Sequence, residues 1–511
     1  MRKPMKHRTR SSLLATRRGL LMVGLCLAAL VLVALQAHLP AQSARPNGGS
    51  GNVSLSPAGS STIDLPLVVR NGLPNSNRPR VNAPYFPVVD VNTVFPQLAV
   101  FWFGHVAPSD NYVDVRVGYS DRELYVYLAV VDRRLWVNPQ PTPATLTAWD
   151  SVSLYLRPLG PAGGGPDANS DRLDAGLYNA AGGALAGYTA AFRGTDTAWA
   201  PAAIPFSTLP GWRGQGLNDN LDDRGWSMAF RLPFTSTFGL GGKPADGAVW
   251  GLGVAVHNRD DAAGTPIPDE HWPAGFDASE PATWGQLAFG LPAAAPSKIL
   301  PRGVVTVRQG LNGATVPDAA VGGTVDNLCP GDPSIWTAWG NQNFAGAPAF
   351  NIQNEADISD WPCFSKYYVT FPLDQVPANK AIISATLSLH QWSNSGPISL
   401  VQPSLVQVLT VGEDWSPASL TWNNAPMALE NVSQAWVPAE QCGQPPAWPC
   451  AARAWDVSRS TDQAYRAGQP LRLVLYSADA AYSSGKFFTS SDSGDWNAAG
   501  RPTLTIAWGE P

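Results

Sequence analysis

Hydrophobic and polar residues alternate with a period of two in the part of the chain that follows residue 111. Residues 112–119 alternate valine with polar or small residues, residues 124–131 form an apolar run, and alternation resumes at 151–156. Successive side chains of a strand point to opposite faces of a sheet, so this period predicts strands, and the break after residue 119 predicts a hairpin. The three segments predict a β-meander, with Trp136 and Trp149 in the loop before its third strand.

Short apolar segments separated by turn residues recur in two blocks, residues 85–290 and residues 303–509. The chain holds 48 Gly and 47 Pro, and only 14% of its residues are charged, which disfavours long helices and favours short strands joined by turns. Residues 291–302 are rich in Pro and Ala and predict a semi-rigid linker. We therefore predict an all-β protein with two consecutive, jelly-roll-like β-sandwich domains.

The N-terminus has the layout of a targeting segment. Seven basic residues flank or precede an apolar stretch at 19–35, and small residues follow. Residues 1–44 are therefore expected to be a signal peptide or, since the apolar stretch is at the lower limit for spanning a bilayer, an uncleaved membrane anchor. Residues 45–84 read as a flexible stalk. The expected location is extracellular or at the cell surface, with no membrane contact unless the anchor is retained.

Charge excludes one class of partner. Without its N-terminal segment the chain has 34 − 7 = 27 basic and 39 acidic residues, a net charge near −12. Phosphate binding needs clustered Lys and Arg, and no basic tract occurs outside the N-terminal segment, so nucleic acid is not an expected partner.

Four cysteines lie outside the N-terminal segment, and an even number in an exported chain predicts two disulfides. Cys442 and Cys450 flank a turn-rich loop that can close on itself, which would leave Cys329 with Cys363. Three pairings are open from the sequence. A metal site is the alternative, but no Cys-x-x-Cys motif or nearby His supports it.

The first block resembles carbohydrate-binding module family 9 and its wider β-sandwich superfamily. The resemblance rests on the order and spacing of segments at 113–121, 124–127, 149–156, 225–230, 249–260 and 284–287. It implies binding of a poly- or oligosaccharide in a slot between two Trp rings, and structural Ca²⁺ in several members. The family commonly accompanies glycoside hydrolases in carbohydrate catabolism.

The sequence departs from that family at the expected sugar site. Thr147 occupies the place of the first sandwiching Trp, with Trp149 displaced to just before Asp150, and Ser153 replaces a Glu. The nearest matches to the second aromatic residue are Trp272 and Phe276. The candidate ligand-binding residues are therefore Trp149, Trp272, Trp136, Phe276, Asp150, Asn258, Arg259 and Asp260.

These candidates have an alternative structural reading. Rings at strand ends can stack on a sugar, but they can equally cap the sandwich core. Asp260 and Asp261 follow a strand in an oxygen-rich loop that suits Ca²⁺, although Asp also favours solvated turns without any metal. No organic cofactor is expected.

The second block resembles the DNRLRE domain, a bacterial extracellular β-sandwich related to carbohydrate-binding module family 96. The segment Thr-Trp-Asn-Asn-Ala-Pro at 421–426 is its most specific element, supported by segments at 368–373, 383–389, 454–458 and 501–506. The resemblance implies polysaccharide binding or a structural role at the cell surface.

Catalysis has little support in the sequence. Glycoside hydrolysis needs two placed carboxylates, whereas Glu123, Glu270, Glu280 and Glu413 fall in turn-like contexts. We therefore expect a secreted, non-catalytic, two-module polysaccharide-binding protein. The alternatives are a cell-surface structural or matrix protein, and an accessory component or hydrolase acting on O-glycosyl bonds. A weaker one is a haem-binding relative that uses Met228 and a histidine such as His257.

Overall fold

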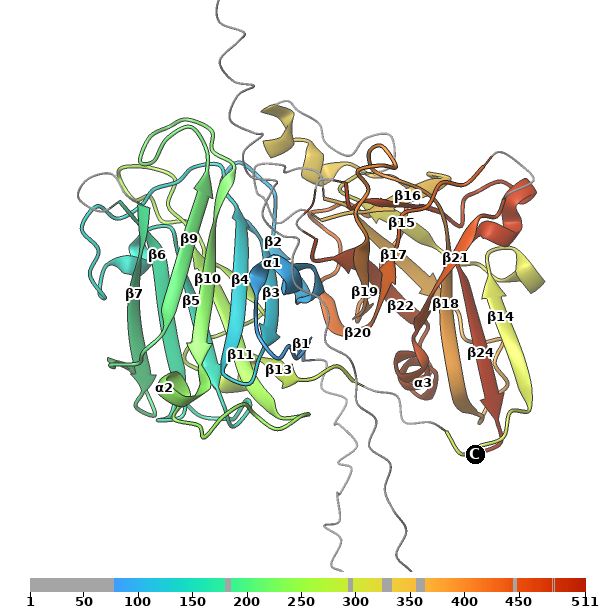
Figure 1. Ribbon diagram of the computed structural model, residues 1–511, viewed down its shortest axis with the longest axis horizontal. Helices are drawn as coiled ribbons and strands as arrows, with labels where there is room; N and C mark the ends of the chain where they lie inside the picture. The colour runs from blue at the N-terminus through green and yellow to red at the C-terminus, as the bar shows by residue number, and fades with distance from the viewer. Residues whose placement is uncertain are drawn as a thin grey trace, which may run out of the picture. The chain divides into compact units, whose positions relative to one another are not determined.

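Strands dominate the computed structural model, which describes residues 78–179, 185–292, 297–323, 333–354, 364–443, 448–479, 481 and 483–511. The described strands form three sheets of 13, 5 and 6 strands (Figure 1). The all-β prediction is confirmed. Residues 1–77, Cys329 and Cys363 lie outside the described ranges, so the predictions made for them stay predictions. No described helix has the length and hydropathy needed to span a bilayer.

The first sandwich encloses one apolar core between the five-stranded sheet and one half of the 13-stranded sheet. Inward-facing residues such as Val115, Leu128 and Leu154 are fully buried. Two short helices, α1 (Val91–Val94) and α2 (Phe234–Phe238), accompany it. Its strands are β2 (Ala99–Gly104), β3 (Tyr112–Tyr119), β4 (Glu123–Val131), β10 (Gly225–Pro233) and β9 (Ser207–Arg213) in one sheet, and β13 (Gly285–Phe289), β11 (Val249–His257), β12 (Glu270–Trp272), β5 (Ser151–Arg157), β6 (Asp171–Asn179), β7 (Leu185–Gly194) and β8 (Trp199–Pro201) in the other.

The predicted meander is correct for two of its strands and wrong for the third. β3 and β4 form the expected hairpin, with Tyr119 opposite Leu124. β5, however, lies in the opposite sheet, where it pairs with β6 and β11. A period of two reports which faces are buried and says nothing about the neighbouring strand, so the loop at 132–150 could cross between sheets without leaving a trace in the pattern.

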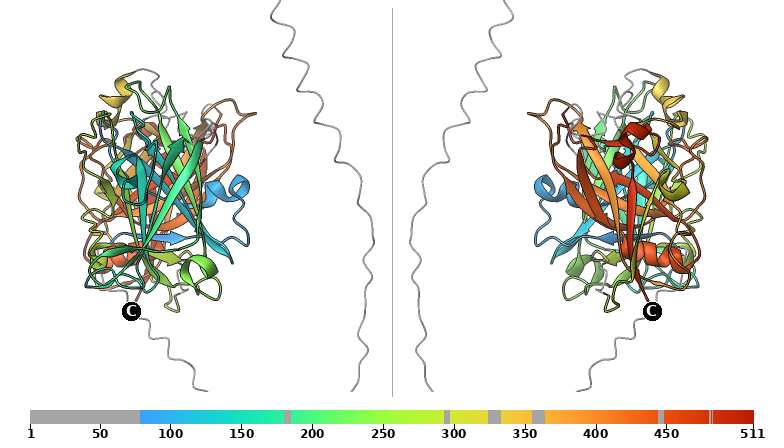
Figure 2. Two further views of the ribbon diagram at one scale, coloured as in Figure 1. Left: turned by 90° about the vertical axis from the view of Figure 1, so that its left-hand side faces the viewer. Right: turned by 90° about the vertical axis from the view of Figure 1, so that its right-hand side faces the viewer.

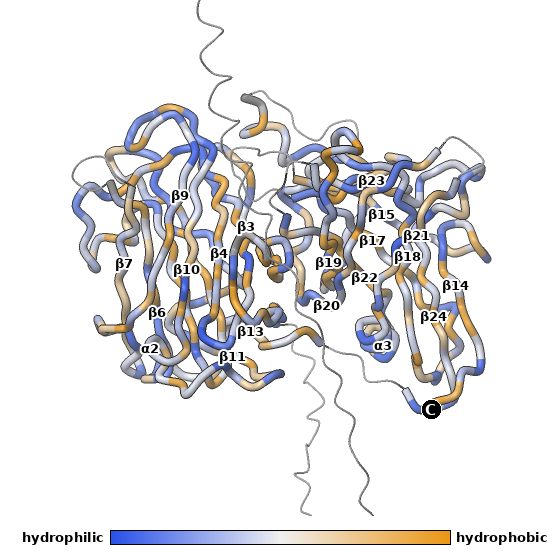
Figure 3. Tube along the Cα trace, in the orientation of Figure 1, coloured by the Kyte–Doolittle hydropathy of each residue, from blue (hydrophilic) through white to orange (hydrophobic). Residues whose placement is uncertain are grey.

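The second sandwich is built in the same way around its own core. Its strands are β14 (Gly303–Arg308), β24 (Thr503–Gly509), β18 (Ala381–Asn394), β23 (Lys486–Thr489), β16 (Ala349–Ile352) and β21 (Ala451–Asp456) in the six-stranded sheet, and β15 (Asp318–Val321), β17 (Lys366–Phe371), β22 (Leu471–Ser477), β19 (Ser404–Val411) and β20 (Ala428–Val437) in the rest of the 13-stranded sheet. Helix α3 (Ser458–Arg466) packs beside β18 and β22. Figure 2 shows the strands of each sandwich from its own side, and Figure 3 shows hydrophobic stretches along the strands.

One strand joins the two sandwiches into a single sheet. β1 (Arg80–Ala83) pairs in parallel with β13 along its whole length and with β20 at Arg80. Asn82 and Asn431 reinforce this junction: the Asn82 amide N–H donates to Asn431 Oδ1 (2.7 Å), and Asn431 Nδ2 donates to the Asn82 carbonyl (3.0 Å). β1 lies within residues 45–84, which were expected to form a stalk.

The outer face of β2 and β3 is covered by the second sandwich. Val100, Trp102 and Tyr112 share a buried cluster with Trp422 and Tyr476. A sandwich standing alone would expose this face to water. Burial on both faces explains why every residue of β3 is buried, including polar ones.

Candidate functional site

The second sandwich carries a row of four aromatic rings, here called the aromatic ladder. Trp392 on β18 lies 5.6 Å from Phe487 on β23 and 6.2 Å from Trp448, measured between ring centroids. Trp448 in turn lies 5.4 Å from Trp496. The ladder thus joins two strands of the six-stranded sheet to the turn at Trp448 and to a short 3-10 helix that carries Trp496.

The ladder leads from a half-buried end to an exposed one. Trp496 is 69% exposed, whereas Trp392, Phe487 and Trp448 are half-buried. Gly494 makes the position of Trp496 possible, because a Cβ atom at residue 494 would lie 2.9 Å from its ring. An exposed indole next to further rings is an apolar surface with a polar edge, the kind of surface that stacks on ligands.

A disulfide and a polar cluster fix the loops around the ladder. Cys442 and Cys450 are bonded, with Cα atoms 5.6 Å apart, which confirms this predicted pairing. Arg453 donates to Gln391 Oε1 (2.8 Å) and to Glu440 Oε2 (3.0 Å). Gln391 is fully buried, and Glu440 lies two residues before Cys442, so this cluster supports the disulfide-closed loop that carries Trp448.

The first sandwich carries a different arrangement, a buried chain of polar side chains on the outer face of β5, β6 and β11, called here the Ser153 network. Ser153 Oγ lies 2.7 Å from Asp174 Oδ1 and 2.9 Å from His257 Nε2. His257 Nδ1 lies 2.9 Å from Asp269 Oδ2, and Arg172 donates two hydrogen bonds to Asp174 (2.8 and 2.6 Å). The strand register places Ser153 directly opposite Asp174, which accounts for the first contact.

The Ser153 network has the composition of a Ser-His-Asp triad but not its hydrogen-bond order. A carboxylate only accepts, so the Ser153 hydroxyl donates to Asp174 and its oxygen accepts from His257. A nucleophilic serine donates instead to the histidine base. Ser153 and Asp174 are also fully buried, so no substrate can reach the hydroxyl. The network is therefore a structural support whose exposed ends are Asp269 and, in part, Arg172.

Aromatic residues flank the Ser153 network. Phe276 packs against Tyr155, with ring centroids 4.9 Å apart. Its ring also covers Gly253, because a Cβ atom at residue 253 would lie only 2.1 Å from it. Trp149 is half-buried, and the Arg259 guanidinium lies over its ring at 3.8 Å. One face of the Trp149 ring is thereby covered, which leaves only the opposite face for a ligand.

Asp150 acts as a clamp for this loop. Its carboxylate is buried and accepts from the backbone N–H groups of Trp136 (2.5 Å) and Arg259 (2.8 Å). Burial, followed by the nearby Asp132 carboxylate, raises the pKa of Asp150. Asp150 thus holds the Trp149–Arg259 pair in place and offers no free oxygen to a sugar.

Two of the predicted ligand-binding Trp residues are buried. Trp272 is 2% exposed and packs on Phe101, with ring centroids 4.4 Å apart, and Trp136 is 8% exposed. A ring enclosed in this way has no face to offer a sugar. Both residues therefore pack in the sandwich core, which was the alternative left open by the sequence. A Trp at a strand end can turn inward as readily as outward.

The predicted metal ligands Asp260 and Asp261 have different surroundings. Asp261 accepts hydrogen bonds from Thr265 Oγ1 (2.6 Å) and Thr265 N (3.1 Å), and these bonds lower its pKa. Burial raises the pKa of Asp260 to about 6. Asn258, two residues earlier, donates to the Ser109 carbonyl (2.9 Å). Calcium at Asp260 and Asp261 stays a prediction.

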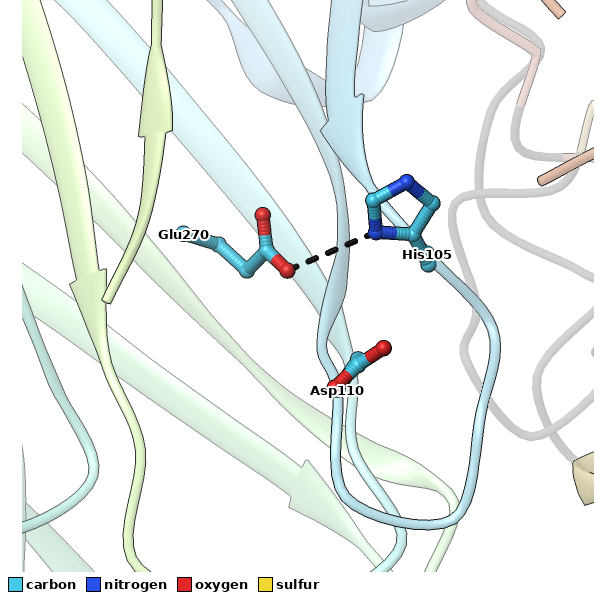
Figure 4. Close-up of side chains that lie close together, drawn as sticks. All are labelled: His105, Asp110 and Glu270. Atoms are coloured by element: carbon cyan, nitrogen blue, oxygen red, sulfur yellow. Dashed lines mark ion pairs between the residues drawn. The ribbon is translucent and has the colours of Figure 1, made fainter. Parts of the chain in front are cut away.

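Another group of possible metal ligands was missed by the sequence reasoning. His105, Asp110 and Glu270 bring their ligand atoms within 4.8 Å of one another (Figure 4). His105 and Asp110 lie on one short loop, whereas Glu270 is far away in the chain, so only the packing of β12 beside β2 brings the three together. Met228, named for a haem alternative, lies in the core of the first sandwich.

A groove of about 740 Å³ opens at the end of the first sandwich near β1. Tyr85, Phe86 and Tyr119 line it, together with Lys243, whose Nζ lies over the Tyr85 ring at 4.3 Å. The Tyr85 hydroxyl donates to Asp121 (2.9 Å). Because the lysine occupies a face of the exposed ring, the groove is a weaker stacking surface than the aromatic ladder.

Comparison with known proteins bears on the second sandwich. Residues 336–506 match the model of carbohydrate-binding module family 96. The resemblance seen in the second block is thereby confirmed, and the matched range contains Trp392, Trp448, Phe487 and Trp496. The match covers less than half of the chain. No curated protein matches this chain.

Two solved structures resemble part of the chain. Both are of a carbohydrate-binding module family 9 from Caldicellulosiruptor kristjanssonii, in complex with cellotriose and with glucose, and each is 16% identical to this chain. They cover 44% and 43% of this chain and 99% and 100% of their own, with TM-scores of 0.29 and 0.28. Similarity at this level carries no argument, so the surfaces of the first sandwich rest on their geometry alone.

Proposed function

We propose that this chain is an exported, non-catalytic protein that binds poly- or oligosaccharides through the aromatic ladder of its second sandwich. The observation that supports this most is the exposed Trp496, backed by Trp448 and Trp392, inside the range that matches family 96. Export is supported by the basic and apolar N-terminal sequence alone.

The proposed mechanism is stacking of sugar rings on the exposed indoles of the ladder. A pyranose ring that lies flat on Trp496 or Trp448 buries its C–H groups against the indole, which contributes apolar burial without closing a deep pocket. Arg453 pairs with Glu440, two residues before Cys442, and thereby helps to hold the disulfide-closed loop that carries Trp448. Because the rings follow one another in a row, the ladder suits several consecutive units of a chain.

The Phe276 and Trp149 surface of the first sandwich is a second, weaker element of this proposal. Phe276 lies over Gly253 within β11, and Arg259 with Trp149 follows the end of that strand. Arg172 and Asp269 supply charged groups on the Ser153 network near this surface. Two surfaces on one chain would raise the apparent affinity for a polysaccharide by avidity.

A structural role at the cell surface is the alternative that one observation favours. Arg259 covers a face of Trp149, and Trp272 and Trp136 are buried, so the predicted sugar slot of the first sandwich is closed. Under this alternative neither sandwich binds sugar. The two proposals predict different effects on polysaccharide binding when the exposed tryptophans are substituted.

Affinity electrophoresis of the purified protein through gels containing plant, algal or bacterial polysaccharides tests the proposal. We expect retardation by at least one polysaccharide, and loss of it on Trp496→Ala or Trp448→Ala. Trp436→Ala is the matched control, because Trp436 is 48% exposed on β20 and is not a ladder residue. Retardation by no polysaccharide would overturn the proposal in favour of the structural role.

A further inference from the structure

Three potential metal ligands converge from separate segments of the first sandwich. His105 directly follows β2, Asp110 lies just before β3, and Glu270 is the first residue of β12. His105 Nδ1 lies 3.6 Å from Glu270 Oε1, and one ligand atom from each residue falls within 4.8 Å of the other two. Figure 4 shows the Glu270 and Asp110 carboxylates on the same side of the imidazole.

We propose that His105, Asp110 and Glu270 bind a divalent first-row transition metal ion, with Zn²⁺ as the best fit. Zinc accepts imidazole and carboxylate together and commonly takes three protein ligands plus a water molecule. Ligand atoms about 2.0–2.2 Å from a tetrahedral ion lie roughly 3.3–3.5 Å apart. Small side-chain rotations would bring the three ligand atoms of this site to those separations. The imidazole argues against Ca²⁺, which prefers oxygen ligands alone.

The local charge favours a cation. Across the described ranges, no Lys or Arg forms an ion pair with Asp110 or Glu270, whereas other acidic side chains, such as Asp222 and Glu430, are paired with arginine. A divalent ion would compensate the negative charge of these two carboxylates.

The backbone around the site is held in place before any ion arrives. The His105 N–H donates to the Asn111 carbonyl (3.2 Å), which closes the loop between β2 and β3. Gly104 has φ +78°, and a Cβ there would lie 1.9 Å from the Asn111 oxygen, so only glycine permits this closure. Glu270 is fixed by its register opposite Val256.

The second sandwich also anchors this loop. Asn423 accepts from the Val106 N–H (2.9 Å) and donates to the Val106 carbonyl (3.0 Å), next to His105. Asn423 belongs to the 421–426 segment that carries the resemblance of the second block. Asn423 is therefore a positioning residue: it touches no metal ligand atom but sets where His105 can lie.

Calorimetric titration of ZnCl₂ into untagged, chelator-treated protein tests the proposal, which does not depend on carbohydrate binding. We expect one saturable site per chain, and at least tenfold weaker binding for His105→Ala and for Glu270→Gln. His271→Ala is the matched control, because residue 271 follows Glu270 on β12 and points to the other face of the strand. Absence of a saturable site, or equal binding by the parent and both ligand variants, would overturn it.

The positioning role of Asn423 has its own readout. Asn423→Ala is expected to weaken zinc binding by about tenfold, as for residues that orient metal ligands, while migration through polysaccharide gels stays that of the parent. If this variant does not fold, Asp110→Asn supplies the third ligand test by the same titration. Zinc affinity that is unchanged in folded Asn423→Ala would contradict the role of the second sandwich at this site.

Discussion

Replacement of Asn431 by Ala tests the junction that makes one sheet out of two sandwiches. The substitution removes two hydrogen bonds, one to the Asn82 N–H (2.7 Å) and one to the Asn82 carbonyl (3.0 Å). Asn82 is fully buried and Asn431 is 4% exposed, so water cannot replace the lost partner without opening the sheet.

The expected cost follows from the two backbone groups left without a partner. Each buried donor or acceptor that loses its partner costs about 1–3 kcal/mol, which gives about 2–6 kcal/mol for the pair. A loss of this size is a large fraction of the free energy of unfolding of an ordinary domain, about 5–15 kcal/mol. Asn431→Ala should therefore clearly lower the urea concentration at which half of the protein is unfolded.

Urea unfolding followed by far-ultraviolet circular dichroism measures this loss. The matched control is Asn220→Ala, which removes one exposed hydrogen bond from Arg134 and should change the free energy of unfolding by less than about 0.5 kcal/mol. If Asn431→Ala behaves like the control, β1 does not join the two sandwiches and the continuous 13-stranded sheet is not maintained in solution.

Three further predictions concern residues inside the sandwiches. Trp272→Ala should destabilise the protein by about 3–5 kcal/mol, because it empties a core site against Phe101, and should leave polysaccharide binding by the remaining folded protein unchanged; a selective loss of binding would contradict its placement in the core. Burial raises the pKa of Asp318 to about 6, above its unfolded value of about 3.9, so its stabilising contribution is complete below about pH 4 and is lost as the pH rises through about 6. Asp318→Asn should therefore gain about 3 kcal/mol relative to the parent between pH 4 and pH 7 in urea unfolding, and a difference that is flat with pH would refute this. Opening the Cys442–Cys450 bond with a mild reductant should cost about 2–3 kcal/mol and weaken polysaccharide binding as well, because Trp448 lies within the closed loop; unchanged retardation in affinity gels would show that the loop does not position the ladder.

The sequence was a good guide to strands and a poor guide to their partners. The alternation at 112–119 and 151–156 predicted β3 and β5 almost to the residue, because the period depends only on which face is buried. The same alternation could not reveal that β5 belongs to the opposite sheet. It also gave no sign that β1 joins the sandwiches, since four residues preceded by a Pro- and Asn-rich stretch carry too little pattern.

Site residues were harder to predict than strands for a physical reason. Trp149, Trp272 and Trp136 have the same type of local sequence context, yet one is half-buried and two are enclosed, and only tertiary packing decides between these outcomes. The ladder residues Trp392 and Trp496 are far apart in the chain and are linked only through Trp448, which contacts both rings. The turn-rich loop between Cys442 and Cys450 and the resemblance of the second block pointed to this sandwich, but neither singled out the ladder residues.

The measurement that tests the central claim most directly is calorimetric titration of the purified protein with an oligosaccharide cut from whichever polysaccharide retards it. The account predicts saturable binding that is at least tenfold weaker in Trp496→Ala and Trp448→Ala and unchanged in Trp436→Ala. Binding that survives in both ladder variants, or that is lost instead on substitution of Tyr85 in the groove near β1, would contradict the assignment of the aromatic ladder as the carbohydrate-binding surface.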